Sequence, residues 1–244
     1  MQEDISPTEL SSKAIKQKST STESNSRTKE LDYNQMRKKS IQSELRNWDP
    51  KTILGKKVKQ GYFSSLYEAL KDGPIKEPQI VDFLQKDIKI QKVDVARVSH
   101  TLKSGKQYLY RVVVLVGNSN GYIGCGVGKS KILANALKKG IFTAKKSILH
   151  VGVLKKYDYS EFYTPITVTN SKKGSTAVVV QPLPGYSVTA SKLGRKYCQL
   201  CNLKGLKIST GNKGRSSKGM VNSPLNYYTA LHEAVTRQLK YVSK

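Results

Sequence analysis

The chain has 244 residues, of which 43 are Lys or Arg and 17 are Asp or Glu, and its formal net charge is +26. A compact protein with this charge repels itself unless a polyanion neutralises it, so nucleic acid is the first expected partner and an acidic membrane the second. The longest apolar run, residues 112–116, is far shorter than the roughly 20 residues that span a bilayer, so we expect no membrane partner.

The N-terminal region lacks the features of a targeting peptide and of a folded segment. Met1-Gln2-Glu3-Asp4 carries acidic side chains and no apolar stretch follows, which predicts a cytosolic protein. Residues 11–45 are mostly Ser, Thr, Lys, Glu, Gln and Asn and cannot bury enough apolar surface to offset chain entropy. We therefore expect residues 1–46 to form a disordered or extended basic tail.

Apolar residues recur regularly from Asn47 onward, and residues 47–87 are predicted to be an N-terminal extension with short helices. Two helices are expected at residues 65–70 and 77–84, because Asp72-Gly73-Pro74 is a turn signal between them.

Residues 88–151 are predicted to form a first small domain. Turns at Ser104-Gly105 and Asn120-Gly121 separate three β-rich segments, so we expect antiparallel strands at residues 93–101, 107–116 and 122–127. Because residues 112–116 are apolar on both faces, the second strand should be central, covered on one side and docked on the other.

A helix is predicted at residues 131–149, with Ser130 as its N-cap. Apolar residues recur at helical spacing on one side, at Leu133, Leu137, Ile141, Ala144 and Ile148. Lysines fall on a separate arc, at Lys131, Lys138, Lys139, Lys145 and Lys146. The element order is helix, three strands, helix, which indicates one sheet with helices on one face.

A linker at residues 152–163 is expected to lead into a second small domain at residues 164–244. Its predicted elements are strands at 166–170 and 175–180, a helix at 190–203, a strand at 206–209 and a last helix that opens at Ser223-Pro224. The buried stripe of that helix should comprise Leu225, Tyr228, Leu231, Val235, Leu239 and Val242. The fold class is therefore α+β, a helix-β-β-β-helix domain followed by a β-α-β-α sandwich.

Three cysteines do not make a disulfide framework, although Cys198 and Cys201 form one C-x-x-C pair. A zinc site needs two more ligands, and Cys125 and the three histidines are scattered singly. We interpret the pair as small hydrophobic residues on a helix face and expect no metal and no cofactor.

The glycine-rich run at residues 117–131 suggests a nucleotide-binding loop, but its spacing is wrong. A phosphate loop needs Gly five residues before Gly128, where the chain has Ile123, and Lys129 or Lys131 stands where the dinucleotide motif needs its last Gly. A nucleotide hydrolase is thereby disfavoured. With isolated histidines and no pair of acids at catalytic spacing, the sequence predicts no catalytic residue and no enzyme.

The alternating glycines at residues 124–128 have two explanations, which do not exclude each other. Gly124, Gly126 and Gly128 share one strand face, which lets an RNA backbone approach closely, or lets the helix at residues 131–149 pack there. At the end of that strand, Lys129, Lys131 and the free amides after Ser130 suit a phosphate.

A second basic segment, residues 211–219, suits phosphate contacts that do not read bases. The full set of predicted RNA-binding residues is Lys103, Lys106, Asn118, Asn120, Gly121, Gly124, Gly126, Gly128, Lys129, Ser130, Lys131, Lys138, Lys213, Arg215 and Lys218.

Several motifs resemble the universal small-subunit ribosomal protein S-five family, of archaeal and eukaryotic type. The likeness is carried by residues 111–118 followed by 120–131, by Asn47-Trp48 and residues 75–84 upstream, and by residues 178–184 downstream. It covers about residues 47–241. Gly185-Tyr186 and Cys201-Asn202-Leu203 depart from the family pattern.

The resemblance implies a first domain similar to double-stranded-RNA-binding domains and a second like the family's C-terminal domain. It also implies a structural part of the small ribosomal subunit that supports translational accuracy. Its expected partners are ribosomal RNA near the decoding region, neighbouring small-subunit proteins, and messenger RNA where it enters the subunit. The alternative is a stand-alone regulator that binds double-stranded RNA.

Overall fold

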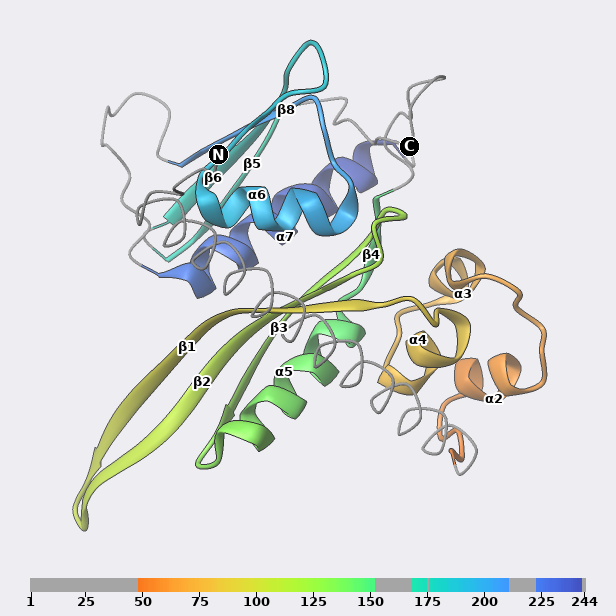
Figure 1. Ribbon diagram of the computed structural model, residues 1–244. Helices are drawn as coiled ribbons and strands as arrows, with labels where there is room; N and C mark the ends of the chain where they lie inside the picture. Colours follow the sequence, from red (N-terminus) through yellow and green to blue (C-terminus); the bar gives the residue numbers. More distant parts are fainter. Residues whose placement is uncertain (1–47, 152–167, 175, 211–222, 243–244) are drawn as a thin grey trace, which may run out of the picture. The chain divides into compact units, whose positions relative to one another are not determined.

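The computed structural model describes residues 48–151, 168–174, 176–210 and 223–242. Residues 50–244 form one compact unit, and the following description concerns its described part (Figure 1). The predicted tail and the linker at 152–163 fall outside the described residues. No described helix is long and apolar enough to cross a membrane.

Three short helices precede the first sheet: α2 (Ile53–Lys59), α3 (Leu66–Asp72) and α4 (Pro78–Leu84). The side chains of Thr52 and Ser65 cap α2 and α3 by accepting hydrogen bonds from the Gly55 and Glu68 amides. The Glu77 carboxylate accepts hydrogen bonds from the amides of Lys51 (3.0 Å) and Thr52 (2.6 Å), which ties the start of α4 to the start of α2. The two predicted helices are present, and α2 was not predicted.

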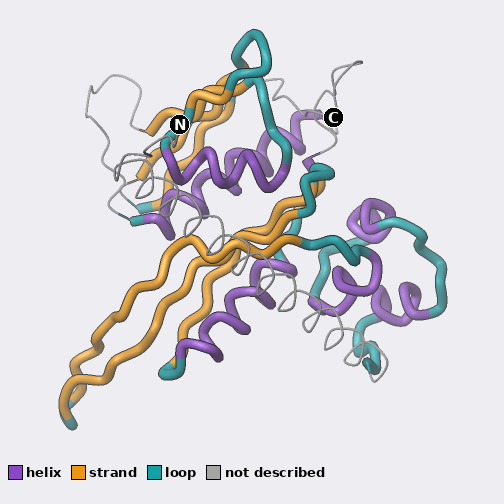
Figure 2. The backbone as a smooth tube through the Cα atoms, viewed as in Figure 1, coloured by secondary structure: helices purple, strands orange, loops and turns teal. Residues whose placement is uncertain are grey.

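The first sheet has the strand order β1-β2-β3-β4, and every neighbouring pair is antiparallel. Its strands are β1 (Lys89–Leu102), β2 (Gly105–Gly117), β3 (Tyr122–Ser130) and β4 (Leu149–His150), and helix α5 (Leu133–Lys146) packs on β3 and β2. The three predicted strands are present. Residues 105–109 of β2 pair only with β1, so the hairpin extends past the end of β3 (Figure 2).

Strand β2 is covered on both faces, as its apolar run predicts. Val112, Val114 and Val116 join a core with Ala136 and Ala144 of α5. Val113 and Leu115 join a second core that includes residues of the helices that follow the first sheet. Every residue from 112 to 116 is fully buried. The sheet is therefore a middle layer.

The second sheet has the strand order β5-β6-β8-β7. Its strands are β5 (Thr169–Lys173), β6 (Thr176–Pro182), β7 (Val188–Thr189) and β8 (Leu206–Thr210). Helix α6 (Lys192–Cys201) connects β7 to β8, which run parallel, while the other pairs are antiparallel. The C-terminal helix α7 (Pro224–Val242) packs on β5 and β6.

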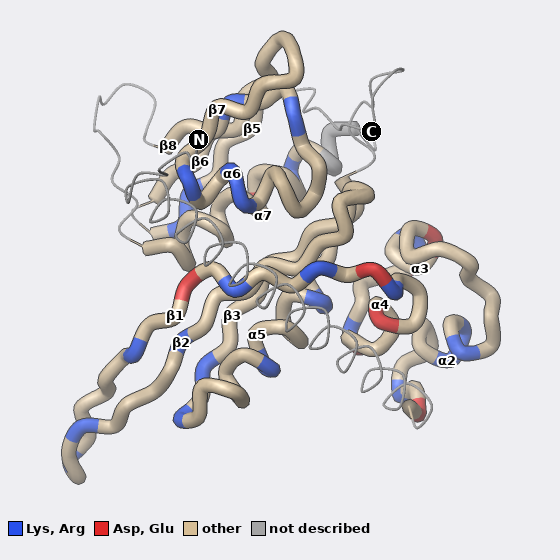
Figure 3. Tube along the Cα trace, viewed as in Figure 1, with Lys and Arg blue, Asp and Glu red and all other residues tan. Residues whose placement is uncertain are grey.

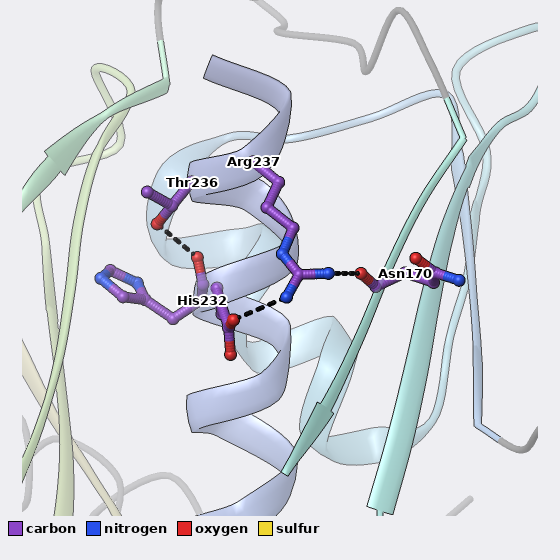
Figure 4. Close-up of polar contacts among 5 residues, drawn as sticks. Asn170, His232, Thr236 and Arg237 are labelled. Carbon is purple, nitrogen blue, oxygen red and sulfur yellow. Dashed lines mark hydrogen bonds and ion pairs between the residues drawn. The ribbon is translucent and has the colours of Figure 1, made fainter. Parts of the chain in front are cut away.

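Opposite sides of α7 make different contacts (Figure 4). The Arg237 guanidinium donates to the Asn170 carbonyl of β5 and pairs with Glu233, each at 2.8 Å. The His232 ring Nε2 lies 2.8 Å from the Ser147 carbonyl, at the end of α5, and Nδ1 lies 3.3 Å from the Tyr197 hydroxyl of α6. His232 thus joins three helices.

The predicted start of α7 at Pro224 is confirmed, but parts of its stripe differ. Its buried side chains are Tyr227, Tyr228, Ala230, Leu231, Ala234, Val235 and Gln238. Leu225 is only partly buried, and the side chains of Leu239 and Val242 lie outside the described residues.

The start of α5 was predicted wrongly. Ser130 is the last residue of β3, and the N-cap is Ile132, which makes no side-chain capping bond. The helix therefore begins without the side-chain acceptor that the sequence suggested.

Candidate nucleic-acid interface

One basic surface comes from a segment without any acidic residue. Residues 95–151 contain ten Lys or Arg and no Asp or Glu. They cover most of β1, all of β2 and β3, and helix α5 (Figure 3). Eight of the ten are exposed, namely Arg97, Lys103, Lys106, Lys129, Lys131, Lys138, Lys139 and Lys146. Because these eight side chains are exposed, they can reach phosphates.

The predicted RNA-binding residues of the first domain lie at opposite ends of the strands. Lys103 and Lys106 flank the tip of the β1–β2 hairpin. Asn118, Asn120 and Gly121 belong to the β2–β3 turn, where the Ser119 amide donates to the Leu200 carbonyl of α6 at 2.8 Å. The structure therefore does not bring these two groups together.

Asn118 has a structural role in that turn. It is buried, and its side-chain oxygen accepts hydrogen bonds from the amides of Asn120 (2.9 Å) and Tyr122 (3.3 Å). Gly121 is also buried and adopts a φ of 81°, which favours glycine. The turn is a four-residue connection that contacts α6, and Asn118 and Gly121 are buried within it.

Helix α5 occupies the glycine face of β3. A methyl group at any of the three glycines would overlap backbone atoms of α5. At Gly124 it would meet Ala144, and at Gly126 it would meet Ala144 and Gly140. At Gly128 it would meet Ala136. The glycines permit close approach of a helix, which is the second of the two explanations that the spacing allowed. RNA contact through this strand face is therefore corrected to helix packing.

Because of this packing, the buried residues of α5 differ from the apolar stripe that the sequence predicted. Ala136, Gly140 and Ala144 face the glycines, while Leu137 and Ile141 are partly buried and Leu133 is exposed. The predicted stripe was shifted because a glycine strand selects the smallest residues for the contact.

Lys145 does not belong to the exposed basic arc. Its side chain is only 4% exposed, and its Nζ lies 2.7 and 2.6 Å from the two carboxylate oxygens of Asp82 in α4. Lys145 is a buried anchor for the N-terminal extension, whereas Lys138, Lys139 and Lys146 remain exposed. Spacing alone could not distinguish these cases, since the partner lies 63 residues away.

The remaining basic residues occupy two sides of the first sheet. Lys129 is paired with Arg111, and their register places both on the face that also carries Val113 and Cys125. Lys138 lies on α5, on the opposite face of the sheet. Ser130 and Lys131, at the end of β3, lie between these two faces.

Sequence reasoning missed Arg97 and Tyr108. The Arg97 guanidinium carbon lies 4.0 Å from the centre of the Tyr108 ring, on the distal part of the hairpin. The hairpin prediction could have found the pair, because register puts Arg97 opposite Tyr110 and Tyr108 opposite Ser99, on one face.

The second basic loop, with Lys213, Arg215 and Lys218, lies outside the described residues. Cys198 and Cys201 are buried on α6, and the Cys201 thiol donates to the Tyr197 carbonyl at 3.1 Å. Burial raises the pKa of Cys125 and of Cys198 to about 12, so in the metal-free fold both side chains are neutral thiols. Within the described ranges, no three metal-ligating side chains come together.

These features define the class of protein: an α+β protein of two sheets whose first sheet and α5 present a basic surface suited to nucleic acid. The family described as ribosomal protein S5, N-terminal domain, matches residues 88–152.

Relatives cover most of the chain. The small ribosomal subunit protein uS5 of Thermoplasma volcanium is 32% identical over 192 residues, which are 76% of this chain and 85% of the relative. That of Hyperthermus butylicus is 33% identical over 203 residues, covering 80% and 92%. A 107-residue match to the Methanococcus maripaludis protein reaches 45% identity, over 43% and 48%. The chain belongs to the uS5 family of small ribosomal subunit proteins.

Proposed function

We propose that this protein is a structural constituent of the small ribosomal subunit that binds ribosomal RNA through its first domain. The carrying observation is the acid-free segment at residues 95–151 with its eight exposed cations. Neutralising phosphates with these cations releases condensed counterions, which favours binding without any base readout. The role is non-catalytic and needs no cofactor.

The proposed RNA surface has three parts. They are the hairpin tip with Lys103 and Lys106, the end of β3 with Lys129, Ser130 and Lys131, and the outer side of α5 with Lys138. Asn120 is exposed in the β2–β3 turn, at the other end of the strands from the hairpin tip. It is a separate candidate contact. Lys213, Arg215 and Lys218 add a proposed contact from the second domain.

Family membership also motivates a location. We propose that the RNA partner lies near the decoding region and the site where messenger RNA enters, that neighbouring small-subunit proteins contact this chain in the cytosol, and that it supports translational accuracy. We further propose residues 47–87, 88–151 and 164–244 as an extension and two domains.

Binding to small-subunit ribosomal RNA tests the surface through its dependence on salt. Changing Lys129, Lys131 and Lys138 to Ala removes up to three phosphate contacts, so the slope of log K against log salt should become shallower by about 2 to 3. The measurement is a titration of the full chain at several salt concentrations.

A control with the same loss of charge separates local contact from net charge. Lys56, Lys76 and Lys86 are exposed and lie before the acid-free segment, and changing them to Ala should leave the slope nearly unchanged. Equal slopes in the two triple variants would remove the first domain's basic surface from the interface.

A further inference from the structure

The distal part of the β1–β2 hairpin carries an aromatic side chain that the fold does not bury. Tyr108 is 47% exposed and lies in the stretch of β2 that pairs only with β1. An isolated two-stranded ribbon gains little from such a residue, because no further layer covers it. An exposed ring at this position is therefore suited to contact with a partner.

The ring is already held on one side. Tyr108 and Arg97 lie diagonally across the two strands on the same face, and the guanidinium stacks over the ring at 4.0 Å. A stacked guanidinium limits the rotation of the phenol, which reduces the ordering cost when a ligand binds.

The surroundings of the ring are basic and partly apolar. Register places Val95, Lys106 and Tyr110 on the same face, and Val95 is 40% exposed. No acidic residue occurs from residue 95 to residue 151. A ligand that combines a flat apolar surface with negative charge fits this face, and an unpaired nucleotide has both properties.

From this arrangement we propose that Tyr108, backed by Arg97, is a stacking platform for an unpaired base of the bound RNA. The phosphates on either side of that base would meet Arg97 and Lys106. This inference rests on the proposed RNA-binding function and adds the class of nucleotide recognised. A paired base cannot use the platform, because its faces are covered by its neighbours in the helix.

The experiment compares two probes and two variants of the full chain. The probes are single-stranded oligoadenylate and a fully paired RNA duplex. Tyr108→Val removes the ring but keeps a β-branched residue suited to a strand, and Tyr108→Phe keeps the ring without the hydroxyl.

We expect Tyr108→Val to bind oligoadenylate about tenfold more weakly, because one base–aromatic stack contributes about 1–3 kcal/mol. The salt slope should not change, because stacking displaces no counterion. Tyr108→Phe should bind both probes as the parent does, and neither variant should lose affinity for the duplex.

Equal affinity of the parent and Tyr108→Val for oligoadenylate would overturn the stacking proposal while leaving RNA binding intact. If Tyr108→Val binds RNA normally but is lost from assembled small subunits, the face contacts protein, and the proposal is equally wrong. Failure of the proposed function would look different, since the parent itself would then show no salt-dependent binding to ribosomal RNA.

Discussion

His232 is the residue that joins the two sheets' helices, and its chemistry follows from its two neighbours. The Ser147 carbonyl can only accept, so ring Nε2 must carry the proton and donate, and Nδ1 accepts from the Tyr197 hydroxyl. Ser147 in turn donates through its hydroxyl to the Cys125 carbonyl of β3 at 2.6 Å. The Tyr197 hydroxyl oxygen can also accept, so hydrogen bonding alone permits either protonation state, and it is burial of the ring that favours the neutral one.

Folding stability should consequently depend on the pH. Burial lowers the pKa of His232 from 6.5 to about 4, so the unfolded chain takes up a proton before the folded one does. The stabilisation is complete above pH 6.5 and is lost as the pH falls toward 4. Between pH 7 and pH 5 the free energy of unfolding should fall by about 2 kcal/mol from this residue.

Urea unfolding at both pH values measures the effect. Burial also lowers the pKa of His150, so the parent should lose somewhat more than His232 alone predicts. In His232→Gln, where an amide can still donate to the Ser147 carbonyl, the difference between the two pH values should shrink by about 2 kcal/mol. An undiminished difference would show that His232 does not sense the pH.

At this scale the sequence predicts some roles better than others. Charge and spacing could identify Lys138 as an exposed cation, but Lys145 has the same spacing and is buried against Asp82. The decisive information is a contact between α4 and α5, which no local pattern encodes. Tyr108 and Arg97 were overlooked because neither residue is unusual on its own.

At the scale of elements, β3 and α5 approach each other closely. Gly124, Gly126 and Gly128 alternate along β3, and Ala136, Gly140 and Ala144 recur every four residues along α5. The two-residue repeat of the strand and the four-residue repeat of the helix place the glycine backbone of β3 against the small residues of α5. The helix therefore lies directly on the strand.

Gly126→Ala should test this contact. Its new methyl group would overlap the Ala144 amide nitrogen and the Gly140 carbonyl oxygen, which are backbone atoms that cannot rotate away. We expect a loss of about 3 kcal/mol in the free energy of unfolding, measured by urea denaturation.

Gly73→Ala is the matched control, because a methyl group there meets nothing within 4 Å and its φ of 171° is extended. It should change stability by less than about 0.5 kcal/mol. Similar losses in both variants would show that the β3–α5 contact is looser than described.

Most elements of five or more residues were predictable, and the two-residue strands were not. The hairpin, β3, α5, α6 and α7 all carry period or turn signals over many residues, and each is present. Strands β4 and β7 have two residues each, too few for any period, and exist because a neighbouring strand offers hydrogen bonds. Helix α2 was missed because its exposed Ile53 gives no clear apolar stripe.

For the whole molecule, the sequence predicted the α+β class, the two sheets and the family, and the structure and the relatives confirm them. Net charge alone fits many polyanion binders. The structure makes the proposal specific, because it removes the glycine face and the β2–β3 turn's buried residues from the candidate surface. What remains is the hairpin, the end of β3 and the outer side of α5.

Sedimentation of a lysate from cells that make this chain tests the ribosomal role most directly. Nearly all of the protein should sediment with the small subunit, and it should remain there through washes at moderate salt, because many phosphate contacts must be broken together. A large free pool, or a pool bound to other RNA at salt that dissociates ribosomes, would contradict the ribosomal role and favour a stand-alone regulator that binds double-stranded RNA.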